Sequence, residues 1–182
     1  MARIVSSFFI SVDGVVESPD EWHFPYFNEE MGTWVQAGMA SAAGFLMGRK
    51  LYDEWFAYWT SPEAEAGIAE MFNAAPKYVV SNSLEKADWA NTTLINGDVA
   101  ARLRELKEQT AEGDFQVSGS ATTVRWLLAN GLLDELNLLV HPIVVGRGQR
   151  LFEDTPTHPL KLAKSETWTT GVLNLCYVPA TA

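Results

Sequence analysis

The stretch DFQVSGSATTVRWLLANGLLDELNLLVHPIVVGRGQR, from Asp114 to Arg150, decides the fold of this chain. Its first residues are typical of a short buried strand that ends at Ser118-Gly119-Ser120, and apolar residues then recur at helical spacing as far as Leu132. Gly131 follows the last turn of that helix, and Leu136 to Val145 is leucine-rich and β-branched enough for a second buried strand. A strand-helix-strand unit of this length predicts two parallel strands of one sheet, joined by a right-handed crossover.

The turn between that first strand and the helix is rich in small and hydroxyl residues. Gly119 allows the backbone to approach a bound group closely, and Ser120, Thr122 and Thr123 bring N–H groups and hydroxyls to the positive end of a helix. A phosphate would be stabilised there. The same residues would also serve simply to cap the helix, as any α/β protein requires, so the turn alone leaves both interpretations open.

Length and composition restrict the class of protein. The 182 residues fit a single domain, residues 1–182, and 47% hydrophobic and 12% aromatic residues indicate a globular chain. Thirteen Lys and Arg against 23 Asp and Glu give a formal net charge of −10, which repels nucleic acid and anionic membranes, so we expect a small-molecule partner. The apolar N-terminal run is too short for a signal peptide and no apolar segment is long enough to cross a bilayer, so the expected location is the cytoplasm.

Neither cysteine nor histidine chemistry is indicated. The single cysteine, Cys176, lies in the apolar pattern VLNLCYV and is expected to be a buried thiol that forms no disulfide within the chain. His23, His141 and His158 are far apart in the sequence and belong to no motif with metal-ligand spacing, so no metal site is predicted.

The N-terminal region predicts a strand, an aromatic loop and a helix. The strand, Arg3 to Val12, ends at Asp13-Gly14, and the loop that follows contains Trp22 and Phe27. So aromatic a loop either closes the core or lines a ligand pocket. Asn28 then caps a helix that runs to about Ala43. Glu29 and Glu30 in its first turn complement the helix dipole, which we favour over the alternative that one of them donates a proton in a pocket.

Two further strands end in polar residues. A strand from Gly44 to Met47 is closed by Gly48, and Arg49 and Lys50 then open a helix, where their positive charge opposes the helix dipole. These cations require either an external anion or the neighbouring carboxylates of Asp53 and Glu54. An acidic helix is predicted from about Pro62 to Asn73. The next strand, Lys77 to Ser81, runs into Ser81-Asn82-Ser83, which either holds a ribose or phosphate or forms a turn.

The remaining chain completes an α/β pattern. It predicts a strand from Thr92 to Ile95, a helix from Val99 to about Thr110, and a C-terminal hairpin of strands Leu160 to Trp168 and Val172 to Val178. The count is about eight strands and five helices. We therefore expect a mixed, mostly parallel sheet with an antiparallel C-terminal edge and helices on both faces.

Four strand-end motifs, taken in order, resemble a known family. SVDGVV, LMGRKLYDEW, VVSNSLE and VSGSATTVRWLL are similar to the motifs of the dihydrofolate reductase-like fold, a three-layer α/β/α architecture. The resemblance covers nearly the whole chain and is closest to the reductase domain of the bifunctional riboflavin-biosynthesis deaminase/reductase and its stand-alone relatives. It implies a homodimer that uses NADPH.

The resemblance also implies cofactor-binding residues. Gly48, Arg49, Lys50, Ser81 and Asn82 match positions around the adenosine phosphates, and a guanidinium or ammonium there would pair with a 2′-phosphate that NADH lacks. The turn that would lie beside the pyrophosphate is Gly119, Ser120, Ala121, Thr122 and Thr123. The strand end that would lie beside the nicotinamide contains Val12 and Gly14.

In the riboflavin branch, hydride reduces the sugar of a ribosylamino-pyrimidine 5′-phosphate to a ribityl chain. By this resemblance Arg147 and Arg150 would meet the phosphate, and Trp22 and Phe27 would form the substrate wall. True dihydrofolate reductases instead use a carboxylate after the aromatic loop, where this chain has Glu30. The loop lacks their Leu-Pro-Trp pattern, which argues against a pterin role. Asp13, with Gly14, matches the Asp-Gly of the riboflavin branch and is the favoured residue beside the reacting carbon. The alternatives are a true dihydrofolate reductase and a non-catalytic nucleotide- or flavin-binding module.

Overall fold

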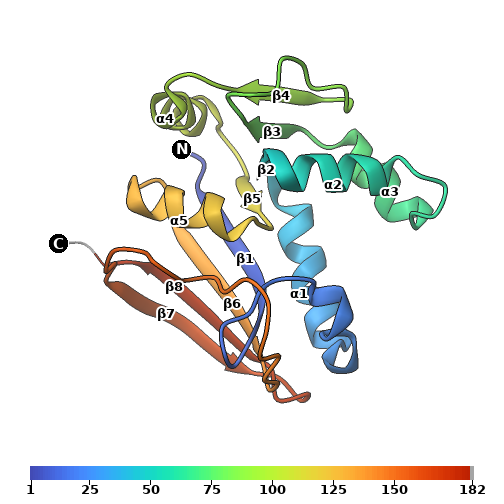
Figure 1. Cartoon of the computed structure of the whole chain (residues 1–182), viewed down its shortest axis with the longest axis vertical. Coiled ribbons are helices and arrows are strands. Elements are labelled where there is room, and N and C mark those ends of the chain that lie inside the picture. The colour runs from blue at the N-terminus through green and yellow to red at the C-terminus, as the bar shows by residue number, and fades with distance from the viewer. Residues whose placement is uncertain (181–182) are drawn as a thin grey trace.

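Eight β-strands form one sheet in the order β4-β3-β2-β5-β1-β6-β8-β7, in a computed structural model that describes residues 1–180 (Figure 1). The strands are β1 (Ile4–Ser11), β2 (Ala42–Gly48), β3 (Lys77–Val80), β4 (Thr92–Ile95), β5 (Asp114–Val117), β6 (Glu135–His141), β7 (Leu160–Thr167) and β8 (Leu173–Pro179). The helices are α1 (Glu29–Ala40), α2 (Arg49–Trp59), α3 (Ala66–Ala74), α4 (Val99–Gln109) and α5 (Ala121–Ala129). Within the described residues, no helix is both long and apolar enough to span a bilayer.

The strand pairing confirms the expected mixed sheet. β1 pairs in parallel with both β5 and β6, so the unit β5-α5-β6 is a parallel crossover whose two strands flank β1. β2 pairs in parallel with β5 and β3, and β3 pairs in parallel with β4. β8 pairs antiparallel with both of its neighbours, β6 and β7, so the β7-β8 hairpin forms an antiparallel edge of the sheet (Figure 1).

Alternating strand residues divide the core between the two faces of the sheet. On one face Ile4 and Phe8 pack against Leu103 of α4 and Leu127 of α5. On the other face, Phe45 and Met47 of β2 pack against residues of α2 and α3. Beside them, α1 covers Leu139 of β6 together with Trp168. The sheet therefore lies between two layers of helices.

Three element boundaries differ from the sequence-based expectation. The helix expected to run to about Ala43 ends at Ala40, and β2 already begins at Ala42. The strand predicted to reach Val145 ends at His141, because Pro142 has no N–H to continue the ladder. The helix predicted from Pro62 begins instead at Ala66, since the Glu65 side chain accepts a hydrogen bond from the Gly67 N–H at 3.2 Å and caps it there.

Lys77 is a lysine whose side chain lies inside the protein. It is 1% exposed, and its Nζ donates to the carbonyl oxygens of Phe72 and Ala75, both at 2.7 Å, and lies 4.5 Å from the centre of the Trp89 ring. Burial lowers the pKa of Lys77 to about 8. The ammonium thus satisfies the last carbonyls of α3 and joins that helix to the sheet.

We expect Lys77→Met to destabilise the protein by about 1–3 kcal/mol, because buried carbonyls at the end of α3 lose their donor. Chemical denaturation measures this loss. The control is Lys86→Met, which removes a surface ammonium whose side chain is 82% exposed and is expected to change stability by less than about 0.5 kcal/mol. Equal stability of the two variants would contradict the role assigned to Lys77.

Candidate functional site

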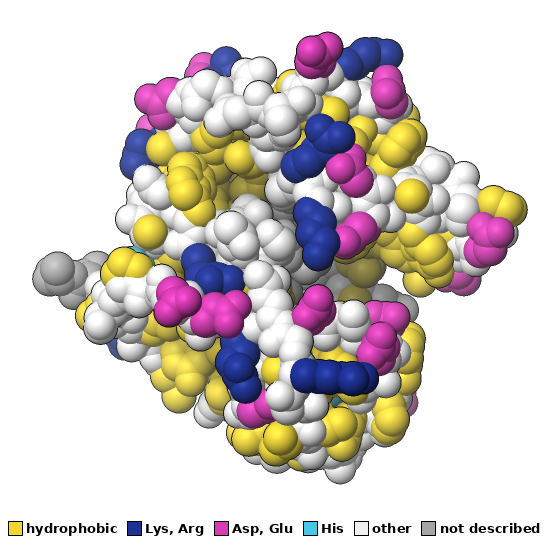
Figure 2. All heavy atoms as spheres, viewed as in Figure 1, with side chains coloured by type: hydrophobic (Ala, Val, Ile, Leu, Met, Phe, Trp, Pro, Cys, Tyr) yellow, Lys and Arg dark blue, Asp and Glu magenta, His cyan; other side chains and the backbone are white. Residues whose placement is uncertain are grey.

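The site lies where the carboxyl ends of the parallel strands β2 and β5 meet. In open α/β sheets, ligands bind beyond this edge because the following helices begin there. A cavity opens at this point and extends over one face of the sheet between α1 and α2. Figure 2 shows the surface hollowed here, with cationic and acidic side chains next to each other along the rim.

Two helix N-termini converge at this edge. Gly48 caps α2 without a side-chain hydrogen bond, and Ser120 caps α5, its hydroxyl accepting from the Thr123 N–H. A Cβ atom added to Gly48 would lie 2.7 Å from the Thr123 hydroxyl oxygen, so glycine is required for this close approach. Gly119 has a φ of +138°, which also favours glycine. The positive ends of both helix dipoles therefore face one part of the cavity.

Two cations stand beside these helix ends. Arg49 Nε donates to Asp53 at 2.7 Å and Lys50 Nζ lies 3.8 Å from Glu54, with all four side chains largely exposed. The intrahelical neighbours considered in the sequence are thus present. Exposed ion pairs at i, i+4 spacing contribute only about 0.3–0.5 kcal/mol to stability. A bound anion of higher charge can therefore compete with Asp53 and Glu54 for Arg49 and Lys50.

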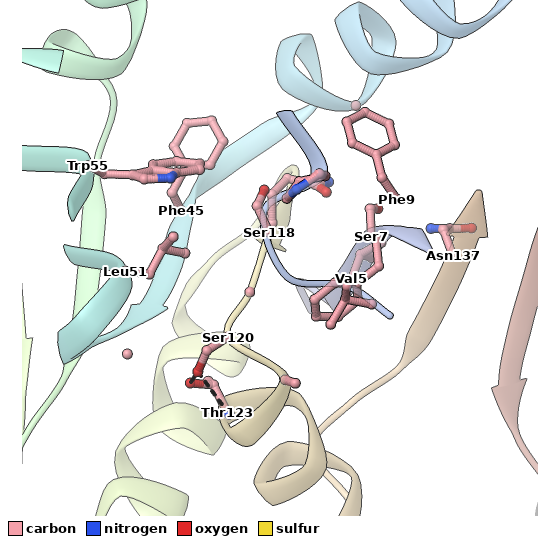
Figure 3. Close-up of a pocket in the computed structure, with 18 of the residues that line it drawn as sticks. Val5, Ser7, Phe9, Phe45, Leu51, Trp55, Ser118, Ser120, Thr123 and Asn137 are labelled. Carbon is pink, nitrogen blue, oxygen red and sulfur yellow. Dashed lines mark hydrogen bonds between the residues drawn. The ribbon is translucent and has the colours of Figure 1, made fainter. Parts of the chain in front are cut away.

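The opposite part of the cavity has aromatic walls (Figure 3). Phe45, Leu51 and Trp55 lie on one side, and Val5, Ser7 and Phe9 of β1 lie on the other, with Ser118 between the two groups. Three neutral polar side chains, Ser7, Ser118 and Asn137, face this space. It can therefore hold a flat ring between apolar surfaces and offer it uncharged hydrogen-bond groups.

Asp13 is bound to a distant loop. Its carboxylate accepts hydrogen bonds from the N–H groups of Val145 at 3.0 Å and Gly146 at 2.8 Å, and from the Ser11 hydroxyl at 2.7 Å. The Ser11 hydroxyl and these N–H groups lower the pKa of Asp13 to about 2. Asp13 is therefore ionised at neutral pH, and it holds the segment after β6 against the end of β1.

Glu30 is engaged in a similar way. It accepts hydrogen bonds from the Thr169 N–H at 2.8 Å, from the Asn28 amide at 2.7 Å and from the Thr169 hydroxyl at 2.5 Å. The bonds from Thr169 and then Asn28 hold the pKa of Glu30 below its ordinary value. This carboxylate joins the start of α1 to the turn between β7 and β8.

The structure brings most of the predicted cofactor residues to one cavity. Those that line it are Gly48, Arg49, Lys50, Asn82, Gly119, Ser120, Ala121, Thr122, Thr123 and, on the substrate side, Phe27. Those outside the lining are Val12, Asp13, Gly14, Trp22, Glu30, Ser81, Arg147 and Arg150.

Several of these outlying residues have clear structural contacts. Trp22 is buried and donates to the Glu17 carbonyl at 3.1 Å, and the Ser81 hydroxyl accepts from the N–H of Leu84 at 3.0 Å. Arg150 donates to the Asp13 carbonyl at 3.0 Å. Their binding roles stay predictions, as do those of Asp13 and Glu30.

The aromatic and hydroxyl side chains of the cavity wall were not predicted as site residues. Ser7, Phe9, Phe45 and Trp55 belong to segments that were expected only to form a strand or a helix. One signal was available, because Ser6 and Ser7 interrupt the apolar run of β1. Such a polar residue at a central strand indicates a lined cavity or a buried hydrogen bond.

His23 and His141 form a buried aromatic group with Phe9. The His23 ring stacks on Phe9 at 4.5 Å, and His141 meets Phe9 edge-on at 5.5 Å. Burial lowers the pKa of both histidines. In residues 1–180 no three histidine, cysteine or acidic side chains are grouped so that they could hold a metal ion.

Comparison with known proteins gives a family match and one curated relative. A family model described as the RibD C-terminal domain matches residues 2–174. The uncharacterized protein YyaP of Bacillus subtilis (strain 168) is 27% identical over 180 residues, which cover 96% of this chain and 94% of that protein.

Solved structures confirm the predicted fold. A protein from Shewanella sp. PV-4 that is assigned by name to riboflavin biosynthesis matches with a TM-score of 0.79 at 21% identity, over 100% of both chains. Dihydrofolate reductase from Enterococcus faecalis, complexed with NADP(H), matches with a TM-score of 0.59 at 13% identity, over 96% of this chain and 93% of that one. The sheet and its two helix layers are thus the dihydrofolate reductase-like fold.

We expect Asp13→Asn to lower the melting temperature at neutral pH, since the loop loses its charged acceptor. Asp13 has a pKa of about 2 in the folded protein and about 3.9 when unfolded. Its contribution is therefore complete above about pH 4 and is lost as the pH falls towards 2. Thermal unfolding of the wild type and of Asp13→Asn from pH 7 to pH 2 measures this. The difference between their melting temperatures should shrink below pH 4.

The control is Glu112→Gln, which changes an exposed carboxylate and should follow the wild type at every pH. The role assigned to the Asp13 carboxylate would be contradicted if the difference in melting temperature between the wild type and Asp13→Asn stayed constant down to pH 2.

Proposed function

Because the chain belongs to the family of RibD C-terminal domains, we propose that it is a reductase that binds NADPH and transfers hydride to a small heterocyclic substrate. The observation that carries this proposal is the convergence of the α2 and α5 N-termini at Gly48 and Ser120. Backbone N–H groups and two helix dipoles aimed at one point provide a binding site for a pyrophosphate.

Cofactor selectivity is assigned to Arg49 and Lys50. Both line the cavity beside the helix N-termini, and Asn82 lies on the same side, after β3. A 2′-phosphate would accept charge-assisted hydrogen bonds from a guanidinium that uses only its Nε towards Asp53. NADH lacks this phosphate, so the cation pair favours NADPH.

The aromatic part of the cavity is proposed to hold the reacting rings. Bound NADPH would supply the hydride. The chain contributes orientation and the exclusion of water, through Phe9 on one wall and Phe45 and Trp55 on the other. Asp13 and Glu30 both have lowered pKa values, so neither suits a proton donor at neutral pH. We propose that Asp13 acts as a positioning residue and that water delivers the proton.

Family membership favours the pyrimidine reductase reaction of riboflavin biosynthesis as the specific assignment. The fold likeness to dihydrofolate reductase alone does not favour pterin reduction, because Glu30 is occupied by Thr169 and Asn28. The homodimer and the cytoplasmic location implied earlier stay predictions.

We expect NADPH to raise the melting temperature more than NADH at equal concentration. A ligand that binds only the folded state at about a hundred times its dissociation constant adds roughly 2.7 kcal/mol of stability. Arg49→Ala should abolish the preference for NADPH and leave the smaller stabilisation common to both nucleotides. The control, Arg102→Ala, removes an exposed cation of α4 that does not line the cavity and should keep the preference.

Stabilisation by neither nucleotide at millimolar concentration would overturn the reductase proposal and favour the non-catalytic module. If NADPH and NADH stabilise the wild type equally, the selectivity role of Arg49 and Lys50 is wrong, but the reductase proposal stands.

A further inference from the structure

We propose that the substrate of this site is an uncharged planar heterocycle without a phosphate group. The proposal rests on the reductase function above, narrows its substrate class and departs from the phosphorylated pyrimidine that family membership favours. It is carried by two independent features of the cavity, the rigid aromatic walls and the excess of carboxylates over lysines and arginines among the described residues that line it.

The aromatic walls are held in place by their own packing. Trp55 lies 4.8 Å from Phe72 and 6.3 Å from Phe45, ring centre to ring centre, so the interior of the protein fixes its orientation. On the other wall, Phe9 stacks on His23 with an angle of 10° between the rings. Preformed apolar walls on both sides of a gap suit a flat, rigid ligand, which loses little conformational freedom on binding.

The polar groups between these walls carry no charge. Ser7 and Ser118 make no side-chain hydrogen bond within residues 1–180, so both hydroxyls are available to a ligand. Asn137 is 6% exposed, and its amide donates to Glu135 at 3.0 Å, which leaves its carbonyl oxygen as an acceptor. Hydroxyls and an amide oxygen match the ring N–H and C=O groups of a neutral heterocycle.

The charges that line the cavity do not favour an anionic substrate. In the described chain every one of the lining cations is paired with a carboxylate: Arg3 with Asp114 and Glu135, Arg49 with Asp53, Lys50 with Glu54, and Lys164 with Glu166. Carboxylates outnumber them, since six line the cavity: Glu17, Asp20, Glu54, Asp98, Asp114 and Glu135. A phosphate here would meet more negative than positive charge, before the charge of the cofactor is added.

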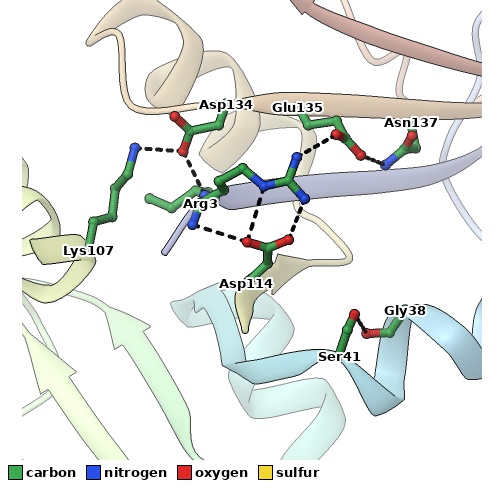
Figure 4. A network of polar contacts seen from close by, with 9 residues as sticks. Arg3, Gly38, Ser41, Lys107, Asp114, Asp134, Glu135 and Asn137 are labelled. Atoms are coloured by element: carbon green, nitrogen blue, oxygen red, sulfur yellow. Dashed lines mark hydrogen bonds and ion pairs between the residues drawn. The ribbon is translucent and has the colours of Figure 1, made fainter. Parts of the chain in front are cut away.

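Arg3, the residue before β1, is paired with two carboxylates (Figure 4). Its Nε and Nη2 donate to Asp114 and its Nη1 donates to Glu135 at 2.9 Å, so two carboxylates surround one guanidinium. The contact with Asp114 is bidentate, which is the strongest form of such a pair. A substrate phosphate that approached Arg3 would therefore lie beside two carboxylates that already offset its charge.

The other cations are remote from the rings or belong to the cofactor side. Lys164 lies on β7, three strands from β1, or roughly 14 Å at the usual strand spacing. Arg49 and Lys50 stand beside the helix N-termini, where the nucleotide phosphates are assigned. Arg147 and Arg150, which the resemblance would place at a substrate phosphate, lie outside the cavity lining.

The test compares three ligands that share a tricyclic ring and differ in charge: lumichrome, riboflavin and riboflavin 5′-phosphate. Each is titrated into the wild-type protein with NADP⁺ present, and quenching of tryptophan fluorescence reports binding. We expect lumichrome and riboflavin to bind at least tenfold more tightly than riboflavin 5′-phosphate, with little dependence on salt, because an uncharged ligand gains nothing from ionic attraction.

Two results would overturn the proposal. The first is binding of riboflavin 5′-phosphate as tight as that of riboflavin or tighter, weakening as salt is added. The second is a protein that binds NADPH but none of the three ligands. In both cases the stabilisation by NADPH is retained, so a failure of the substrate class is distinguished from a failure of the reductase function, in which NADPH does not bind.

Variants of α2 locate the binding. Trp55→Leu removes one aromatic wall and should weaken lumichrome binding at least tenfold, while the preference for NADPH over NADH, which is assigned to Arg49 and Lys50, is kept. The control is Tyr58→Leu on the same helix, which changes a side chain that is 49% exposed and does not line the cavity. Trp55→Phe keeps an aromatic face in a folded core and should restore most of the affinity. Unchanged lumichrome binding in a folded Trp55→Leu protein would overturn the proposed location.

Discussion

The close approach of two helices at Gly48 is the constraint on which the site depends. β2 and β5 are neighbours in the sheet, with Gly44 opposite Phe115 and Phe45 opposite Gln116, so the helices that follow these strands must begin side by side. A side chain at position 48 would collide with Thr123. The parallel pairing therefore positions two sets of helix N–H groups at one edge, and every ligand contact assigned above is arranged around them.

Three carboxylates hold distant segments of this protein together. Asp13 binds the loop after β6, Glu30 binds the turn between β7 and β8, and Asp114 binds Arg3. Hydrogen bonds stabilise the ionised forms of Asp13 and Glu30. The consequence for function is a cavity whose aromatic part contains hydroxyls and an amide in place of charged groups, which restricts the chemistry of its substrate.

The two helix N-termini to which phosphate binding is assigned were predictable because their signals are local. Gly48, Gly119 and Ser120 lie at the junctions between strands and helices, where a glycine permits a tight turn and a hydroxyl caps the following helix. The aromatic side was not predictable in the same way. The alternation of side chains along β1 and β2 assigns each residue to one face of the sheet. It does not show that Phe9 and Phe45 line a cavity and not the core, because that depends on where α1 and α2 lie.

The sequence by itself determined the element order, the parallel crossovers and the strand ends that carry the cofactor motifs, because apolar periodicity and turn residues act over short distances. Only the tertiary structure decided what the charged residues do. Asp13 meets Val145 and Arg3 meets Asp114 across more than a hundred residues of chain. Which carboxylate meets which donor depends on strand order, and no local pattern encodes that order.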